Sequence, residues 1–311
     1  MSATAYRERL DSQSRKVVCR GEFRTGFTLI ELLVVLGIIS ILTATLIPVL
    51  GKVRQQARRV ISVGNMREIA GAVTCYADDN NGRYPPSVAT LGFGNNWNWQ
   101  EPTYLTAYRK RSTAMYRSVS AYLHRYLAEA DSLFCPSAPV KYKYLQQAWD
   151  AGDEWNNPDI APLPEALLGT YCLYWNYTGY LGEDAGLFRG PRGPVRGSRE
   201  GRILVTDYLG YDHFRSPKAY GSCERFRHAT VTEGSDISSA FWSRPGQWTS
   251  EELAALNVKL YAGYVDGHVE SYLPTDTVPM QVILHPETGE PYPDNAGISP
   301  GIFYLPRLGL R

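Results

Sequence analysis

Residues 24–50 read RTGFTLIELLVVLGIISILTATLIPVL. A basic stretch ends at Gly26, Phe27 begins an apolar run, and Glu31 is the only ionisable residue between Phe27 and Leu50. A carboxylate inside a membrane helix costs roughly 2.5–3.5 kcal/mol, so such a residue usually has a functional reason to be there. The stretch therefore predicts a membrane helix that carries one functional acid close to its start.

The apolar run is long enough to cross a bilayer. It has 24 residues, 17 of them apolar, and a spanning helix needs about 20 residues. Pro48 is tolerated in a membrane helix and is expected to kink it. A secretory signal peptide would have a shorter apolar core followed by an A-x-A-like site. An ordinary single-pass anchor would explain the length, but neither Glu31 nor the Gly26–Phe27 pair.

Gly26 before Phe27, with Glu31 four residues inside the run, resembles the N-terminal motif of type IV prepilins and type II secretion pseudopilins. The resemblance implies that residues 1–26 are a cytoplasmic leader. It also implies that a prepilin peptidase cuts between Gly26 and Phe27 and methylates the new amine of Phe27. The partners implied are that peptidase, other pilin or pseudopilin subunits, the inner-membrane assembly platform and the lipid bilayer.

Glu31 then acquires a role in assembly. The new ammonium group at Phe27 of one subunit can pair with the Glu31 carboxylate of a neighbour. In hydrocarbon this pairing offsets a desolvation cost that neither charge alone could bear. The hypothesis is that the ion pair sets the axial register between subunits.

The charges on the two flanks of the run do not decide its orientation. Basic residues flank the run on both sides: Arg15, Lys16, Arg20 and Arg24 before it, and Lys52, Arg54, Arg58 and Arg59 after it. The resemblance implies a single-pass protein of the inner membrane with its C-terminal domain in the periplasm or outside the cell, able to enter a filament.

The helix is expected to continue beyond the span at residues 27–50. Residues 51–82 become amphipathic, with apolar positions at helical spacing. The run from Asp78 to Gly82 should end the helix, and Pro85 and Pro86 prevent it from resuming. A helix from Phe27 to about Asp78 would be on the order of 75 Å long. A helix that is half membrane span and half domain element is the pilin-like architecture.

Residues 83–273 predict a globular α+β domain with an antiparallel β-sheet. A second helix is expected near residues 113–127, and strands at 170–175, 202–207, 258–265 and 268–273. Asp266 and Gly267 join the last two strands, and Asp-Gly is the favoured pair for a type I′ hairpin turn. Residues 274–311 are rich in Pro and Gly, so a C-terminal tail is expected there.

The same elements resemble a branch of pseudopilin-like proteins with an "H-X9-DG" C-terminal region. The matching residues are the runs 134–137 (FCPS), 203–207 (ILVTD), 227–228 (RH), 257–258 (NV) and 265–269 (VDGHV). That family has about nine residues between its His and its Asp-Gly. Here 37 residues separate His228 from Asp266, so the spacing of this chain departs from that of the family.

Four cysteines remain once the leader, with Cys19, is removed. They are Cys75, Cys135, Cys172 and Cys223. Four cysteines fit one or two disulfides in an oxidising compartment, and three full pairings are open. Buried thiols are the alternative.

Two further groups of residues are candidates for ligand binding. Asp207, His228, Asp266 and His268 could converge on a metal ion, although turn and strand roles account for them as well. Trp97 and Trp99, which lie among asparagines, could stack on a sugar or pack against their own domain.

Composition and motifs exclude other classes of function. A net charge of +1 gives no basic patch for nucleic acid. The sequence has no nucleophile, metalloprotease, phosphate-loop or dinucleotide motif, so no catalytic residue and no cofactor are expected. A structural pseudopilin-like subunit is the first hypothesis. A membrane-held or filament-tip binding module for carbohydrate or exported substrate is the second, and a membrane-anchored hydrolase the third.

Overall fold

The structure is a computed structural model. It describes residues 27–90, 98–99, 101–106, 118–136, 145–155, 167–194, 202–211, 217–221, 224–225, 249–256, 258–285, 288, 290 and 301–307. The expected leader, with Gly26 and Cys19, lies outside these residues, as do Trp97, Cys223 and His228. The chain divides into two compact units, residues 1–51 and 52–311, and each is described by itself.

Helix α1 runs from Leu29 to Asp79 without a break, which confirms the single long helix expected from the sequence. Pro48 lies within it. The helix ends where Asn81 and Gly82 take positive φ values of 56° and 71°. The Gly82 N–H then donates to the Ala77 carbonyl at 2.8 Å, a C-terminal cap that needs the left-handed conformation.

The first unit contains the apolar part of α1. Its side chains are exposed, and this segment is long and apolar enough to cross a membrane. Ser40, Thr43 and Thr45 donate their hydroxyl hydrogens to helix carbonyls at 2.7–2.9 Å. These polar side chains are therefore satisfied within the helix and do not need water.

The second unit packs its part of α1 into the domain core. Met66, Ile69 and Val73 are fully buried, as their helical spacing predicts. The hydroxyls of Ser62 and Tyr171 are hydrogen-bonded at 2.8 Å, and the Asn65 amide donates to the Phe134 carbonyl at 3.1 Å. Both apolar and polar contacts fix this stretch of helix to the domain.

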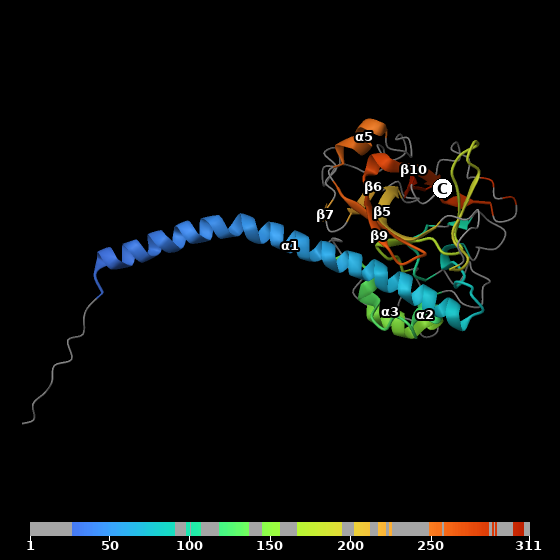
Figure 1. The fold of residues 1–311 in the computed structure, drawn as a ribbon, viewed down its shortest axis with the longest axis horizontal. Helices are drawn as coiled ribbons and strands as arrows, with labels where there is room; N and C mark the ends of the chain where they lie inside the picture. Colours follow the sequence, from blue (N-terminus) through green and yellow to red (C-terminus); the bar gives the residue numbers. More distant parts are fainter. Residues whose placement is uncertain are drawn as a thin grey trace, which may run out of the picture. The chain divides into compact units, whose positions relative to one another are not determined.

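An antiparallel β-sheet forms the centre of the second unit (Figure 1). Strand β5 (Ile203–Tyr211) is its longest strand. One end of β5 pairs with β2 (Tyr171–Leu173) and β8 (Leu260–Tyr264). The other end pairs with β6 (Pro217–Gly221) and β12 (Ile302–Pro306). The buried apolar run at 203–205 that predicted this strand lies in the end of β5 that pairs with β2 and β8.

The remaining strands extend the sheet from these neighbours. The main path runs β4-β3-β10-β12-β5-β6-β7, and β9 pairs with β8. A separate antiparallel pair joins β1 (Asn98–Trp99) to β11 (Ile283–Leu284). The other strands are β3 (Thr178–Tyr180), β4 (Leu187–Arg189), β7 (Glu224–Arg225), β9 (Val269–Tyr272) and β10 (Thr277–Gln281).

The expectation of an irregular tail from residue 274 onward needs correction. Strand β10 and strand β12 lie in this segment and pair with each other over five residues. Strand β12 also pairs with β5, with Ile302 opposite Tyr211. The buried side chains of β12 belong to the domain core, so the segment is part of the domain.

The second helix is also shorter than expected. Helix α2 covers Val119–Leu123, and residues 124–126 form a turn; residues 113–117 lie outside the described part. It lies beside the end of α1 (Figure 1). The ring of Tyr76 contacts those of Tyr122 and Tyr126 edge-on, with centroids 6.0 and 6.2 Å away. The Tyr126 hydroxyl donates to Asp79 at 2.6 Å.

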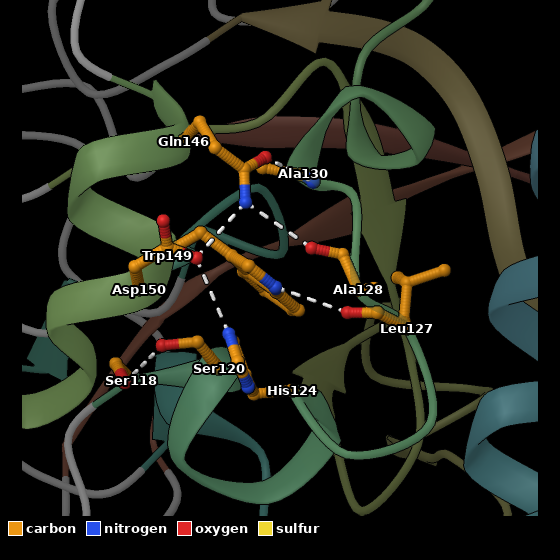
Figure 2. Close-up of polar contacts among 9 residues, drawn as sticks. All are labelled: Ser118, Ser120, His124, Leu127, Ala128, Ala130, Gln146, Trp149 and Asp150. Atoms are coloured by element: carbon orange, nitrogen blue, oxygen red, sulfur yellow. Dashed lines mark hydrogen bonds and ion pairs between the residues drawn. The ribbon is translucent and has the colours of Figure 1, made fainter.

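Polar side chains connect α2 to α3 (Leu145–Ala151) (Figure 2). The Gln146 amide donates to the Asp150 carboxylate and to the Ala128 carbonyl. His124 contacts the same carboxylate at 3.2 Å, and the Trp149 indole N–H donates to the Leu127 carbonyl at 3.0 Å. Helices this short are not stable alone, so these contacts account for their order.

One further helix and four 3₁₀ helices complete the described elements. Helix α5 (Ser250–Ala255) starts with a capping box between Thr249 and Glu252. The 3₁₀ helices are η1 (Val88–Thr90), η2 (Ala130–Leu133), η3 (Gly152–Glu154) and η4 (Pro274–Asp276).

Candidate assembly motif at the start of helix α1

Thr28 and Glu31 form a reciprocal cap at the start of α1. The Thr28 backbone N–H and hydroxyl both donate to Oε2 of Glu31 at 2.8 Å. In return, the Glu31 N–H donates to the Thr28 hydroxyl oxygen at 3.2 Å. This is a capping box, in which two side chains satisfy backbone donors that a helix start otherwise leaves open.

The cap lies among exposed apolar side chains. Phe27, Leu29 and Ile30 are each more than two-thirds exposed. A carboxylate in hydrocarbon is costly unless hydrogen bonds or an opposite charge compensate it. Thr28 supplies two hydrogen bonds, and a carboxylate has about four acceptor sites. Glu31 therefore keeps the capacity to accept from a cation on another molecule.

Sequence reasoning found Glu31 and Phe27 but missed the part that Thr28 plays. The pattern T-x-x-E at 28–31 is the sequence form of a capping box, so the signal was available. Gly26, the other residue of the expected cleavage site, lies outside the described residues, whereas Phe27 is described.

The candidate metal residues are engaged in other contacts. Asp207 lies in β5, is fully buried, and accepts the Tyr261 N–H at 2.8 Å. Asp266 contacts His268 through a short hydrogen bond and pairs with Arg202 at 3.2 Å. Within the described residues, no group of three or more His, Cys, Asp or Glu side chains is placed to hold a metal ion. His228 lies outside them.

The neighbours of Asp266 lower the pKa of its carboxyl group. Partial burial raises the pKa of its carboxyl, but hydrogen bonds from His268 and the positive charges of His268 and Arg202 outweigh burial, so the pKa is lowered. The His268 ring stacks on Tyr264 with centroids 4.4 Å apart, and burial raises the pKa of Tyr264 to about 12. These contacts organise the β8–β9 hairpin.

The turn between β8 and β9 differs from the expected type I′. Gly267 has φ of 81°, and Asp266 is not among the described non-glycine residues with positive φ. The Gly267 N–H donates to the Tyr264 carbonyl at 2.9 Å, and the Tyr264 N–H donates to the His268 carbonyl at 3.0 Å. A type I turn followed by a left-handed glycine fits these contacts, and it is the usual three-residue hairpin loop.

The described cysteines show no disulfide among themselves. Cys75 is exposed, whereas Cys135 and Cys172 are buried. Burial raises the pKa of the Cys172 thiol strongly, which keeps it in its unreactive neutral form. Cys223 lies outside the described residues, as does Trp97, and Trp99 is described only in its backbone.

Comparison with known proteins identifies the motif at the start of α1. Residues 24–47 match the family described as the prokaryotic N-terminal methylation motif. No curated protein and no solved structure gives a significant match to the chain. The fold, a long N-terminal helix with an antiparallel sheet domain, is a pilin-like α+β arrangement. The prepilin-type motif at residues 24–47 thus supports a place for this chain among the pilins and pseudopilins.

Proposed function

We propose that this protein is a structural pseudopilin-like subunit. Prepilin peptidase cleaves its precursor after Gly26 and methylates Phe27. The mature subunit then joins like subunits in a filament of a type II secretion or type IV pilus-like machine. The observation that carries the proposal is the methylation motif at residues 24–47, which coincides with the start of a helix able to span a membrane.

The apolar half of α1 holds the subunit in the inner membrane before assembly. Its side chains from Phe27 to Leu50 are exposed, as a lipid-facing helix requires. The sheet domain follows this span in the chain and lies on the periplasmic or outer side. The same exposed surface is then available to pack against the helices of neighbouring subunits.

Cleavage creates a positive charge, the new N-terminal ammonium group, that can pair with Glu31. The free ammonium group at Phe27 pairs with the Glu31 carboxylate of a neighbouring subunit, whose remaining acceptor sites are open beside the two used by Thr28. Each charge is costly in hydrocarbon, and pairing removes most of that cost. The pairing fixes the axial register of adjacent helices.

Processing tests the cleavage step. We expect the Gly26→Val precursor to remain uncut when it is co-expressed with a prepilin peptidase, because the side chain obstructs the bond to be cleaved. Gly21→Val changes another leader glycine by the same amount and serves as the matched control. Normal processing of the Gly26 variant, seen as the same mass shift as in the wild type, would show that the cleavage site is elsewhere.

Assembly tests the ion pair separately. Glu31→Gln removes the charge but can still accept hydrogen bonds from Thr28, whereas Glu31→Ala removes both. If the charge sets the register, both variants are cleaved normally and both fail to co-purify with wild-type subunits in sheared filaments. Normal incorporation of Glu31→Gln would contradict the ion-pair mechanism and leave only a capping role for Glu31.

A further inference from the structure

One side of α1 is basic where the helix leaves the apolar span. Lys52, Arg54 and Arg58, called here the basic face, have exposed side chains. At about 100° per residue they lie within an arc of about 160° around the helix axis. In the part of the chain that the structure describes, none of the three takes part in an ion pair. Their charges are therefore available to another molecule.

The basic face continues the side of α1 that the domain covers. Ser62, Met66, Ile69 and Val73 are buried, and at about 100° per residue they lie inside the same arc, in the turns that follow the basic face. A partner of the basic face would therefore sit next to the domain, on one side of the helix. A one-sided charged surface of this kind suits a folded protein with acidic side chains.

The opposite side of the helix is apolar at the same level. Val53 and Val60 are more than half exposed, and at about 100° per residue they lie roughly opposite the middle of the basic face. In a filament, this apolar side can continue the contacts that the exposed span makes with neighbouring helices. The basic face then points away from those helices and towards the domains of neighbouring subunits.

Two exposed acids form a complementary surface on the same chain. Glu68 of α1 accepts a hydrogen bond from the Ser132 hydroxyl at 2.6 Å, and a carboxylate has further acceptor sites. Ser132 belongs to η2, whose N-cap residue is Glu129. The Glu129 side chain is exposed and makes no capping hydrogen bond. Glu68 and Glu129, called here the acidic patch, therefore lie about one 3₁₀ turn apart.

The basic face and the acidic patch of one chain are too far apart to pair. No Asp or Glu lies between Glu31 and Glu68, so α1 supplies no nearer acid. Glu68 lies about 15–24 Å along the helix from Arg58 and Lys52, at 1.5 Å per residue. Exposed charges separated by more than about 8 Å are largely screened at physiological salt. A second copy displaced by the same distance along the axis would bring its acidic patch level with the basic face.

This displacement agrees with the register given by the proposed ion pair. Pairing of the Phe27 ammonium group with Glu31 of the next subunit shifts adjacent helices by four residues, about 6 Å. Three such steps amount to about 18 Å, which lies within the required range. Glu68 of the subunit three steps away is then level with the turn between Arg54 and Arg58.

We propose that the basic face binds the acidic patch of a second copy of this chain, displaced by about 20 Å along α1. The proposal rests on the filament assembly given under the proposed function. Each subunit uses its basic face towards one neighbour and its acidic patch towards another. Such a head-to-tail interface does not close on itself, as an open filament requires.

Zero-length cross-linking of the full-length protein identifies the partner. A carbodiimide joins a lysine amine to a carboxylate in direct contact with it. In membranes of cells that also express the peptidase and the assembly machine, it should give a covalent dimer whose linked peptides join Lys52 to Glu68 or Glu129. Arg54→Lys and Arg58→Lys keep the charge and add an amine, so each should raise the yield of dimer. Absence of the dimer, or Lys52 linked only to a different protein, would overturn the proposal.

Charge reversal tests whether the contact supports assembly. K52E/R54E/R58E and E68K/E129K should each lower the yield of sheared filaments by at least about fivefold, because each places like charges opposite one another. The variant that combines all five changes should recover the yield, which a misfolded protein would not do. Equal yields from the wild type and either reversed variant would overturn the proposal.

A matched control reverses the same number of charges elsewhere. Arg83, Arg189 and Arg307 are exposed and belong to neither the basic face nor the acidic patch. R83E/R189E/R307E should therefore form filaments like the wild type. A loss in this control equal to that in K52E/R54E/R58E would show that net charge, and not the basic face, governs the yield.

The result can be separated from that of the proposed function. A chain that is not cut after Gly26 but still gives the dimer linked from Lys52 to Glu129 would refute the prepilin assignment and leave the interface intact. A chain that is cut there and forms filaments, with no loss in the reversed variants, would do the opposite.

Discussion

Oε2 of Glu31 accepts two hydrogen bonds from Thr28, one from the backbone N–H and one from the hydroxyl, each at 2.8 Å. The acid that marks the membrane helix is therefore also the cap of that helix. The two roles are compatible because a carboxylate has more acceptor sites than Thr28 fills. In the proposed assembly, Thr28 thereby limits the cost of holding Glu31 in the bilayer before a neighbouring subunit arrives.

Removing the Thr28 hydroxyl should loosen the first turn of α1. Loss of such a cap costs about 1 kcal/mol, so in Thr28→Val the Glu31 amide should exchange its hydrogen roughly fivefold faster in detergent micelles. Thr28→Ser keeps the hydroxyl and should exchange like the wild type. Unchanged exchange in the valine variant would mean that the cap does not form in a membrane-like medium.

The contact between Ser62 and Tyr171 should behave as a coupled pair. Their hydroxyls lie 2.8 Å apart and are buried between α1 and β2. Ser62→Ala and Tyr171→Phe should each lower the free energy of unfolding by about 1 kcal/mol. The double variant should lose less than the sum, because neither hydroxyl is then left unpaired. Chemical denaturation of all four proteins measures the coupling, and strict additivity would rule it out.

Replacing Gly267 or Gly71 with alanine should change the stability of the protein in opposite directions. Gly267 has φ of 81°, so Gly267→Ala should destabilise the β8–β9 hairpin by about 1 kcal/mol. Gly71 lies within α1, and a Cβ there meets nothing within 4 Å. Gly71→Ala should therefore stabilise the protein by about 1 kcal/mol. Thermal unfolding compares the two, and a stabilising Gly267 substitution would contradict the turn geometry.

Asp266 should contribute to stability at neutral pH and lose that contribution in acid. The pKa of its carboxyl is lowered in the fold from its ordinary value of 3.8. A lowered pKa gives stability that is present above the unfolded value and is lost as pH falls through the folded value. Wild type and Asp266→Asn should therefore differ in unfolding temperature at pH 7 and converge below about pH 4.

A second variant controls for the loss of a surface carboxylate. Asp276 is exposed in η4 and has no part in the contacts of Asp266 with His268 and Arg202. Asp276→Asn should follow the wild type across the pH range. A pH-independent gap between wild type and Asp266→Asn would show that the charge of Asp266 is not what stabilises the hairpin.

The sequence was sufficient for the elements whose pattern is local. The 3.6-residue spacing in α1 and the apolar run in β5 predict both elements closely, because burial imposes that periodicity. The capping glycine after Asn81 similarly predicts where α1 ends. These features depend on residues near one another in the chain.

Strands β10 and β12 could not be predicted in this way. Pro279 lies inside β10, and proline argues against a paired strand. It is tolerated because β3 pairs with β10 only at Gln281. Strand β12 owes its position to β5, about 90 residues earlier in the chain. Such pairings arise from tertiary contact, which short apolar segments do not encode locally.

The same distinction between local and long-range patterns applies to the candidate sites. The placement of Glu31 and Phe27 is a local pattern, and so is the T-x-x-E cap, although the apolar run around Thr28 hid its role. The metal hypothesis required residues from three separate segments of the chain to come together: Asp207, His228, and Asp266 with His268. The short hydrogen bond between Asp266 and His268, and the Asp207 contact with Tyr261, depend on the strand register of the folded domain.

The mass of the N-terminal peptide of the membrane-embedded protein tests the account most directly. After co-expression with a prepilin peptidase, digestion and mass spectrometry should give a peptide that begins at Phe27 and carries one added methyl group on its amine. A mature protein that still begins with the leader, or that begins at any residue other than Phe27, would contradict the account.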